Sequence, residues 1–147
     1  MRTSVGTLLS ELVSSTQRLS RIAVREAGDT TSAATWRTLD ALQTVSPQRL
    51  GELASLTRVS QPTMTGTVAT LAERGWVQRI TDPSDARAQL IDITPAGVVA
   101  IEEWRDRAAA AMEPYFDELG DEDYAALERA VDILAKRTAL AEPSARR

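Results

Sequence analysis

The sequence contains no cysteine and no histidine. The first absence excludes disulfides, thiolate nucleophiles and thiol-based redox sensing, and the second excludes imidazole general bases. Together they exclude the Cys/His ligand sets of zinc sites. A hydrolase would have to pair a Ser or Thr with the single lysine, Lys136, or with a carboxylate. We therefore predict that the protein is not an enzyme and that it uses no cofactor.

Aromatic residues make up only 4% of the chain, and long apolar runs are missing as well. No run approaches the roughly 18 residues that span a bilayer, and Glu11 interrupts the N-terminal segment before the apolar region of a signal peptide can form. The 147 residues, of which 43% are hydrophobic, suffice for one domain with a core built mainly from Leu, Ala, Val and Ile. We expect a soluble, cytoplasmic, mainly helical domain with no membrane partner.

The net charge of -4 is unusual for a protein that binds nucleic acid, so its distribution matters. Residues 1–45 carry five basic and four acidic residues, residues 46–97 carry five of each, and residues 98–147 carry seven basic against twelve acidic ones. A neutral middle segment is compatible with a lobe that faces DNA. The acidic runs at 117–118 and 121–123 lack the order of a calcium loop and suit the start of a helix, so we predict no metal site.

Apolar residues three and four positions apart predict a helix from Val5 to about Glu26 and a second one over Ala33–Leu42. Ser46-Pro47, a capping residue followed by proline, predicts the start of a third helix that runs to about Leu56. The inner stripe of that helix is predicted to be Leu50, Leu53 and Leu56.

After the short segment 57–59, Ser60-Gln61-Pro62 predicts another helix start. This helix is expected to run to Arg74, to bury Met64, Val68 and Leu71, and to leave a polar and nearly uncharged face exposed. Beyond Gly75, the segments Trp76–Ile80 and Gln89–Ile93 are strand-like and flank turn-forming residues, which predicts a β-hairpin with a long tip over residues 81–88.

The C-terminal part is predicted to be helical. Thr94-Pro95 repeats the capping residue and proline, and Pro114 should end or kink the helix that they start. A last helix is expected after Gly120, followed by a frayed tail.

Two short helices joined by a three-residue turn and followed by a hairpin form a winged helix-turn-helix. The fold class is therefore predicted to be mainly α with a small β-hairpin wing. The second of the two helices can enter a major groove of about 12 Å, and the hairpin can place an Arg in the minor groove.

The residues from Leu50 to Gly97 closely resemble the multiple antibiotic resistance regulator (MarR) family of bacterial transcription factors. The resemblance is carried by Ser60, Pro62, Thr63, Leu71, Arg74-Gly75-Trp76-Val77, Asp85, Arg87, Leu90 and Thr94-Pro95-Ala96-Gly97. It implies a single MarR-like domain over residues 1–147, with a winged helix-turn-helix DNA-binding lobe at 30–97 and helical dimerisation regions at 1–28 and 98–147. It further implies a homodimer that binds an inverted-repeat operator in double-stranded DNA, acts most often as a repressor, and responds to a small organic effector, by family habit an aromatic acid.

The predicted DNA contacts are Arg58, Ser60, Gln61, Pro62, Thr63, Thr65, Gly66, Arg74, Arg79 and Arg87. Asp85 is expected to support the wing by holding a neighbouring Arg in place. Gly66 stands where many relatives carry an Arg, which removes a guanine contact of about 1–3 kcal/mol. For Arg58, in the turn, a phosphate contact and plain solvent exposure both stay open.

The dimerisation residues are predicted to be Val5, Leu8, Leu9, Leu12, Leu127, Val131, Leu134 and Leu140. Trp36 is a candidate ligand contact, because the effector cleft of MarR-like proteins lies near this helix, although core packing alone would also explain it. The alternative function is a helical ligand-binding or interaction module that has lost DNA binding, for which Gly66 and the neutral middle segment are the motivation.

Overall fold

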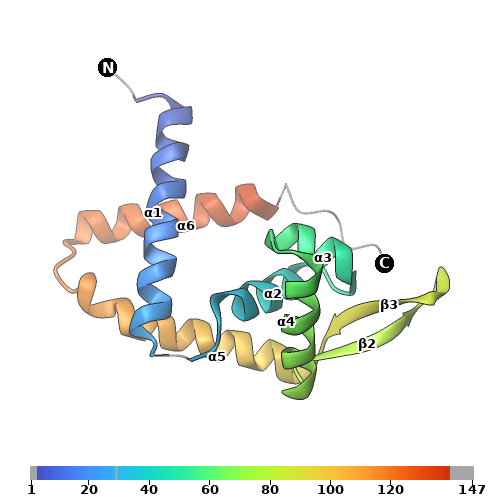
Figure 1. Cartoon of the computed structure of the whole chain (residues 1–147). Helices are drawn as coiled ribbons and strands as arrows, with labels where there is room; N and C mark the ends of the chain where they lie inside the picture. The colour runs from blue at the N-terminus through green and yellow to red at the C-terminus, as the bar shows by residue number, and fades with distance from the viewer. Residues whose placement is uncertain (1–2, 29, 140–147) are drawn as a thin grey trace.

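The computed structural model describes residues 3–28 and 30–139. The elements, in chain order, are α1 (Val5–Glu26), α2 (Ala33–Thr44), β1 (Gln48–Arg49), α3 (Leu50–Thr57), α4 (Gln61–Glu73), β2 (Val77–Asp82), β3 (Asp85–Ile93), α5 (Pro95–Met112), the 3₁₀ turn η1 (Glu113–Tyr115) and α6 (Asp121–Ala139). Helices α2, α3 and α4 and the hairpin gather into one lobe, α1 extends away from it, and α5 leads from the base of the hairpin to the opposite end, where α6 begins (Figure 1). The predicted fold class, mainly α with a small β-hairpin wing, is confirmed.

Side-chain caps determine where four of the helices begin. The hydroxyls of Ser4, Ser32, Ser60 and Thr94 each accept a hydrogen bond from the backbone N–H three residues further on. Such a cap satisfies a backbone donor that has no partner inside the helix. The predicted starts at Ser60-Gln61-Pro62 and Thr94-Pro95 are therefore confirmed, as are both ends of α1.

The predicted helix start at Ser46-Pro47 is wrong. These residues precede β1 and are joined by a cis peptide bond, and α3 begins only at Leu50. The Ser46 hydroxyl donates to Asp92 Oδ1 at 2.6 Å and accepts from the backbone N–H of Ile93 at 3.1 Å. The hydroxyl is thus used by β3 and cannot cap a helix.

The predicted inner stripe of α3 is only partly correct. Leu53 is fully buried and Leu50 is half-buried, but Leu56 is 58% exposed, and Ala54 is buried instead. Each step of three residues turns an α-helix about 60° short of a full circle, so Leu56 has moved about 120° from Leu50 around the helix axis. An eight-residue helix packed on one side leaves that position in solvent.

The hairpin has longer strands and a shorter tip than the sequence suggests. Strands β2 and β3 pair antiparallel from Val77 opposite Ile93 to Thr81 opposite Gln89, and an irregularity then places Asp82 opposite Asp85. Only residues 83 and 84 separate the strands, so the predicted long loop over 81–88 is wrong. The irregularity accommodates the extra residues of β3, so the two strands remain paired up to Asp82.

Strand β1 adds a third member to this sheet, which has the order β1-β3-β2. It pairs with β3 through Gln48 opposite Ile91 and Arg49 opposite Leu90. Because β1 leads directly into α3, the base of the wing is joined by backbone hydrogen bonds to the first helix of the helix-turn-helix.

The core lies between the lobe helices, the sheet and α5. Three tryptophans are stacked in it, with Trp36 5.4 Å from Trp76 and 5.3 Å from Trp104 between ring centroids. The buried residues of this core are Trp36, Leu39, Leu42, Leu53, Ala54, Met64, Val68, Leu71, Val77, Ile91, Ala100 and Ile101. The predicted buried line of α4 is confirmed by Met64, Val68 and Leu71.

Candidate nucleic-acid interface

The outward face of α4 is polar and carries no charge near its start. Gln61, Pro62, Thr63, Thr65 and Gly66 are all exposed there. The Ser60 hydroxyl caps the helix and lies 2.8 Å from that of Thr63, and the Thr65 hydroxyl donates to the Gln61 carbonyl at 2.9 Å. Short side chains at a helix N-terminus allow its backbone to come close to a flat surface such as base edges.

Gly66 lies in the middle of this face. A Cβ atom added at this position would meet no atom of the described residues within 4 Å. Packing inside the described part of the chain therefore does not require a glycine here. The position leaves open space on the outward side of α4.

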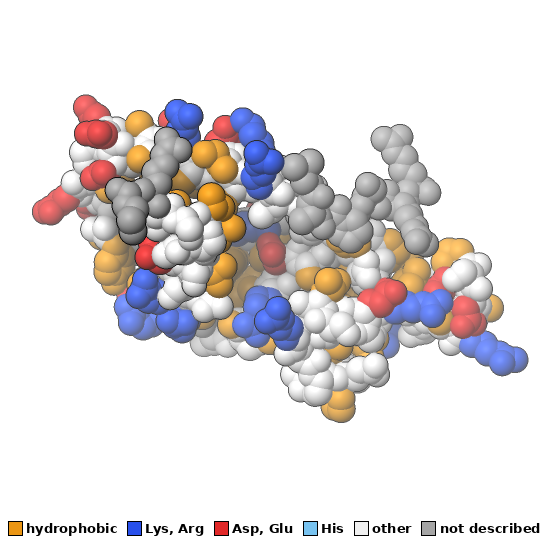
Figure 2. Space-filling model, turned by 90° about the horizontal axis from the view of Figure 1, so that it is seen from above, with side chains coloured by type: hydrophobic (Ala, Val, Ile, Leu, Met, Phe, Trp, Pro, Cys, Tyr) orange, Lys and Arg blue, Asp and Glu red, His pale blue; other side chains and the backbone are white. Residues whose placement is uncertain are grey.

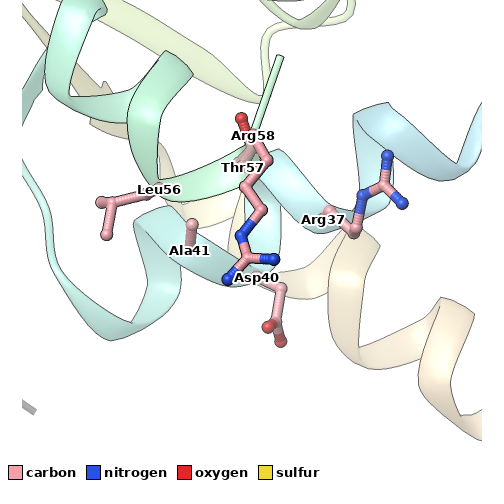
Figure 3. A pocket seen from close by; sticks show the side chains of 6 residues that line it. All are labelled: Arg37, Asp40, Ala41, Leu56, Thr57 and Arg58. Carbon is pink, nitrogen blue, oxygen red and sulfur yellow. The ribbon is translucent and has the colours of Figure 1, made fainter. Parts of the chain in front are cut away.

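Arg58 forms the turn between α3 and α4 and adopts the left-handed conformation, with φ of 55°. Its side chain extends from the turn toward Asp40 of α2 (Figure 3). The two residues line a surface cavity of about 420 Å³. Arg58 is exposed, and in this position it is directed toward α2.

Arg74 follows the last residue of α4 and joins three parts of the lobe. Its Nη1 donates to the hydroxyl of Thr31 at 2.9 Å, and its guanidinium lies 4.8 Å from the centroid of the Trp76 ring. A cation over an indole face is attracted by the ring quadrupole. Arg74 thus ties the α1–α2 connection to the base of the wing.

The wing presents two arginines. Arg79 on β2 reaches across to Gln89 on β3, with 3.5 Å between Nη1 and Oε1. Arg87 lies further toward the tip and is exposed, and its backbone N–H donates to Asp85 Oδ1 at 3.0 Å. Asp85 therefore contacts its neighbouring Arg through the main chain. No hydrogen bond of the Arg87 guanidinium is found within residues 3–28 and 30–139.

Sequence reasoning missed one contact that shapes the wing. Asp82, whose side chain is 7% exposed, accepts hydrogen bonds from the backbone N–H and hydroxyl of Ser84 and forms an ion pair with Arg49. The bonds from Ser84 and the guanidinium of Arg49 lower the pKa of Asp82 to about 2. The run Asp82-Pro83-Ser84 has the pattern of a turn closed by an Asp side chain. This pattern was the sequence signal that could have predicted the contact between Asp82 and Ser84.

Acidic side chains are unevenly distributed along the molecule. Acidic side chains gather at the end where α5 is joined to α6, opposite the wing (Figures 1 and 2). A nucleic-acid backbone near α4 and the wing would thus lie away from this acidic end, which reduces repulsion.

A second cavity lies beside the core between α1, α2 and α5. It has a volume of about 710 Å³ and is lined by Gln17, Ser20, Arg21, Val24, Ala33, Trp36, Arg37, Asp40 and Trp104. Trp36 is only 3% exposed, so it packs in the core and also forms part of the cavity wall. The indole N–H groups of Trp36 and Trp104 are buried and have no hydrogen-bond partner in the described part of the chain.

The outer helices expose much apolar surface. In α1, Val5 is 71% exposed and Leu8 and Leu9 are each 52% exposed. In α6 no residue is buried, and Leu127 and Val131 are 45% and 59% exposed. Leu12 and Leu134 are half-buried, and Leu140 lies outside the described residues. Within the described ranges, no helix is long and apolar enough to cross a membrane.

Helices α3 and α4, the short turn between them and the three-stranded wing define a winged helix-turn-helix protein. Residues 31–88 match the model of the MarR family. Over these residues the chain is similar to the MarR family.

Known proteins from three bacteria are similar to this chain. The uncharacterized HTH-type transcriptional regulator YwoH of Bacillus subtilis (strain 168) is 33% identical over 88 residues, which are 60% of this chain and 64% of the relative's length. The crystal structure of the transcriptional regulator Tm0710 from Thermotoga maritima is similar, with 28% identity, a TM-score of 0.63 and coverage of 92% of each chain. A structure of BpsR from Bordetella bronchiseptica, whose DNA binding is regulated by 6-hydroxynicotinic acid, has 25% identity and a TM-score of 0.57 over 90% of this chain and 93% of that one.

Proposed function

We propose that this protein is a dimeric, cytoplasmic, sequence-specific DNA-binding regulator of transcription that acts as a repressor. The observation that carries the proposal is the exposed polar face of α4 beside a wing with Arg87 near its tip. In this arrangement α4 enters the major groove, where Ser60, Gln61 and Thr63 approach base edges. Arg87 reaches the adjacent minor groove, where its charge gains from the negative potential.

The proposed dimer rests on the exposed apolar residues of α1 and α6. Contiguous apolar surface of this kind marks an interaction site in soluble proteins. A two-fold dimer presents two copies of α4 and two wings, and it therefore requires an operator with inverted half-sites whose centres are about one helical turn, or 10–10.5 bp, apart. A repressor of this kind is expected to bind DNA that overlaps a promoter.

The experiment uses the DNA upstream of the gene that encodes the chain. We expect sedimentation to show a dimer at micromolar concentration and a gel shift to reveal an inverted repeat bound at least about 10³-fold more tightly than scrambled DNA of equal length. A folded monomer would contradict the dimer. Equal binding of both DNAs would contradict sequence-specific recognition and would favour the alternative, a ligand-binding or interaction module that has lost DNA binding.

The cavity beside Trp36 is proposed as the site of a small organic effector that releases the protein from DNA. Its wall combines two indole rings with Arg21 and Arg37, and flat apolar surface next to guanidinium groups suits an aromatic carboxylate. The regulation of BpsR by 6-hydroxynicotinic acid, an aromatic acid, supports this chemistry. Such a ligand acts by binding the DNA-free and DNA-bound conformations with different affinity.

For this cavity the probe is 6-hydroxynicotinic acid, and its neutral amide is the matched control. We expect the acid to quench tryptophan fluorescence and to weaken operator binding about tenfold, whereas the amide has a much smaller effect because it cannot pair with an arginine. Arg21→Ala should reduce the response to the acid. Quenching without any change in operator binding would contradict the effector role.

A further inference from the structure

We propose that Arg49 and Asp82 form a clamp that sets the position of the wing, so that a pair of residues outside the predicted DNA contacts controls operator affinity through Arg87. The proposal rests on the proposed function and adds two positioning residues to it. The clamp is defined by Arg49, Asp82 and Ser84.

The two carboxylate oxygens of Asp82 serve different parts of the molecule. Oδ2 accepts from Arg49 Nε at 2.9 Å and from Arg49 Nη2. Oδ1 accepts from the backbone N–H of Ser84 at 2.8 Å and from its hydroxyl at 2.7 Å. One carboxylate therefore holds the hairpin turn with one oxygen and the helix-turn-helix with the other.

Arg49 belongs to the helix-turn-helix side of this contact. It is the residue that precedes α3, and its backbone N–H donates to Glu52 in the first turn of that helix at 3.2 Å. In the sheet order β1-β3-β2, Arg49 lies opposite Leu90 of β3, while Asp82 ends β2. The Arg49 side chain thus crosses the middle strand and connects the outer two.

The outer half of the wing, beyond Leu90, is a two-stranded ribbon, and the Arg49 side chain links it to β1. Strand β1 supports β3 only at Leu90 and Ile91, and the ladder is irregular at Thr81 and Asp82. Two-stranded ribbons twist more than larger sheets and are marginally stable alone. Arg87 lies three residues beyond Leu90 toward the tip, so its position depends on how firmly that ribbon is held.

The clamp predicts an effect opposite to simple electrostatics. Removing the Asp82 charge takes a negative group away from DNA, and Coulomb attraction alone would then strengthen binding. If Asp82 acts by positioning the wing, its loss instead moves Arg87 out of the groove and weakens binding. The sign of the change separates the two explanations.

The test measures operator affinity across a salt titration for Arg49→Ala, Asp82→Asn and the double variant. We expect each single variant to weaken binding about tenfold and to flatten the salt dependence by about one charge, because one phosphate-region contact is lost. The double variant should bind no worse than either single variant, and Arg87→Ala added to Asp82→Asn should cost little more. The control variant is Glu103→Gln, at an exposed residue of α5 that has no hydrogen bond in the described residues. It changes the net charge as Asp82→Asn does, and its operator affinity should stay within about twofold of that of the parent.

Operator binding by Asp82→Asn at parental strength or tighter would overturn the clamp. Additive losses for Arg49→Ala and Asp82→Asn would also overturn it, because Arg49 would then act independently, as a direct phosphate contact does. Thermal unfolding of each variant shows that the assay uses folded protein.

Hydrogen exchange of the wing amides tests, without DNA, whether Arg49 holds the wing in place. In Arg49→Ala the amides of Ser84 and Arg87 should exchange faster than in the parent, and the amides of α4 should not. Unchanged exchange would refute the clamp. A parent protein that binds no DNA refutes the proposed function alone, and the exchange measurement still decides whether Arg49 holds the wing.

Discussion

Gly97→Ala is expected to lower the free energy of unfolding by about 2–3 kcal/mol, because it forces an atom into space that the backbone already fills. A Cβ at Gly97 would lie 2.1 Å from the carbonyl oxygen of Trp76 and 2.9 Å from Cγ1 of Ile93. That carbonyl also accepts the backbone N–H of Thr94 at 3.0 Å, which fixes the start of α5 to the base of the wing. Neither the carbonyl nor the helix can move without breaking this contact.

Denaturant unfolding of Gly97→Ala measures this effect, and Gly66→Ala is the matched control. Both glycines lie in helices, but a Cβ at Gly66 meets no described atom within 4 Å. Gly66→Ala should therefore raise the free energy of unfolding by up to about 1 kcal/mol, since alanine favours a helix interior over glycine. Equal stability of Gly97→Ala and the parent would mean that α5 and Trp76 are not packed as closely as described.

Arg87→Ala is expected to weaken operator binding by about 1–3 kcal/mol, which is roughly a 5- to 150-fold loss. The guanidinium is exposed and the backbone of Arg87 is held by Asp85, so the side chain is presented on a firm support. In a minor groove it gains from the local potential and releases counterions, whereas on the free protein it stabilises almost nothing. The salt dependence should flatten by about one charge, and thermal stability should hardly change.

A salt titration of operator binding checks this prediction, with Arg79→Ala as the comparison on the same wing. Arg79 lies further from the tip and already contacts Gln89, so its loss should cost less than that of Arg87. If Arg87→Ala bound the operator like the parent at every salt concentration, the wing would not contact DNA and α4 would have to supply recognition alone.

Local signals in the sequence were enough to locate most helices. The hydroxyl caps at Ser60 and Thr94 act within three residues of their own position, and prolines restrict only their nearest neighbours. The buried line of α4 follows from helical periodicity, which is also a property of one short segment. The motifs from Ser60 to Gly97 were likewise sufficient for the resemblance to the MarR family, because their spacing lies within one stretch of chain.

Contacts between distant segments decided the features that the sequence did not predict correctly or did not predict at all. The pattern at Ser46-Pro47 is that of a helix start, but the hydroxyl of Ser46 is bound by β3, 46 residues away at Asp92. Leu56 points into solvent because α3 packs on one side only. Arg49 and Asp82 are 33 positions apart, and only the pairing of β1 with β3 brings them together. The sequence by itself determined the local elements and the resemblance to the MarR family. The attachment of the wing to the helix-turn-helix was decided by tertiary structure, since no local pattern specifies which distant side chain will satisfy a buried polar group.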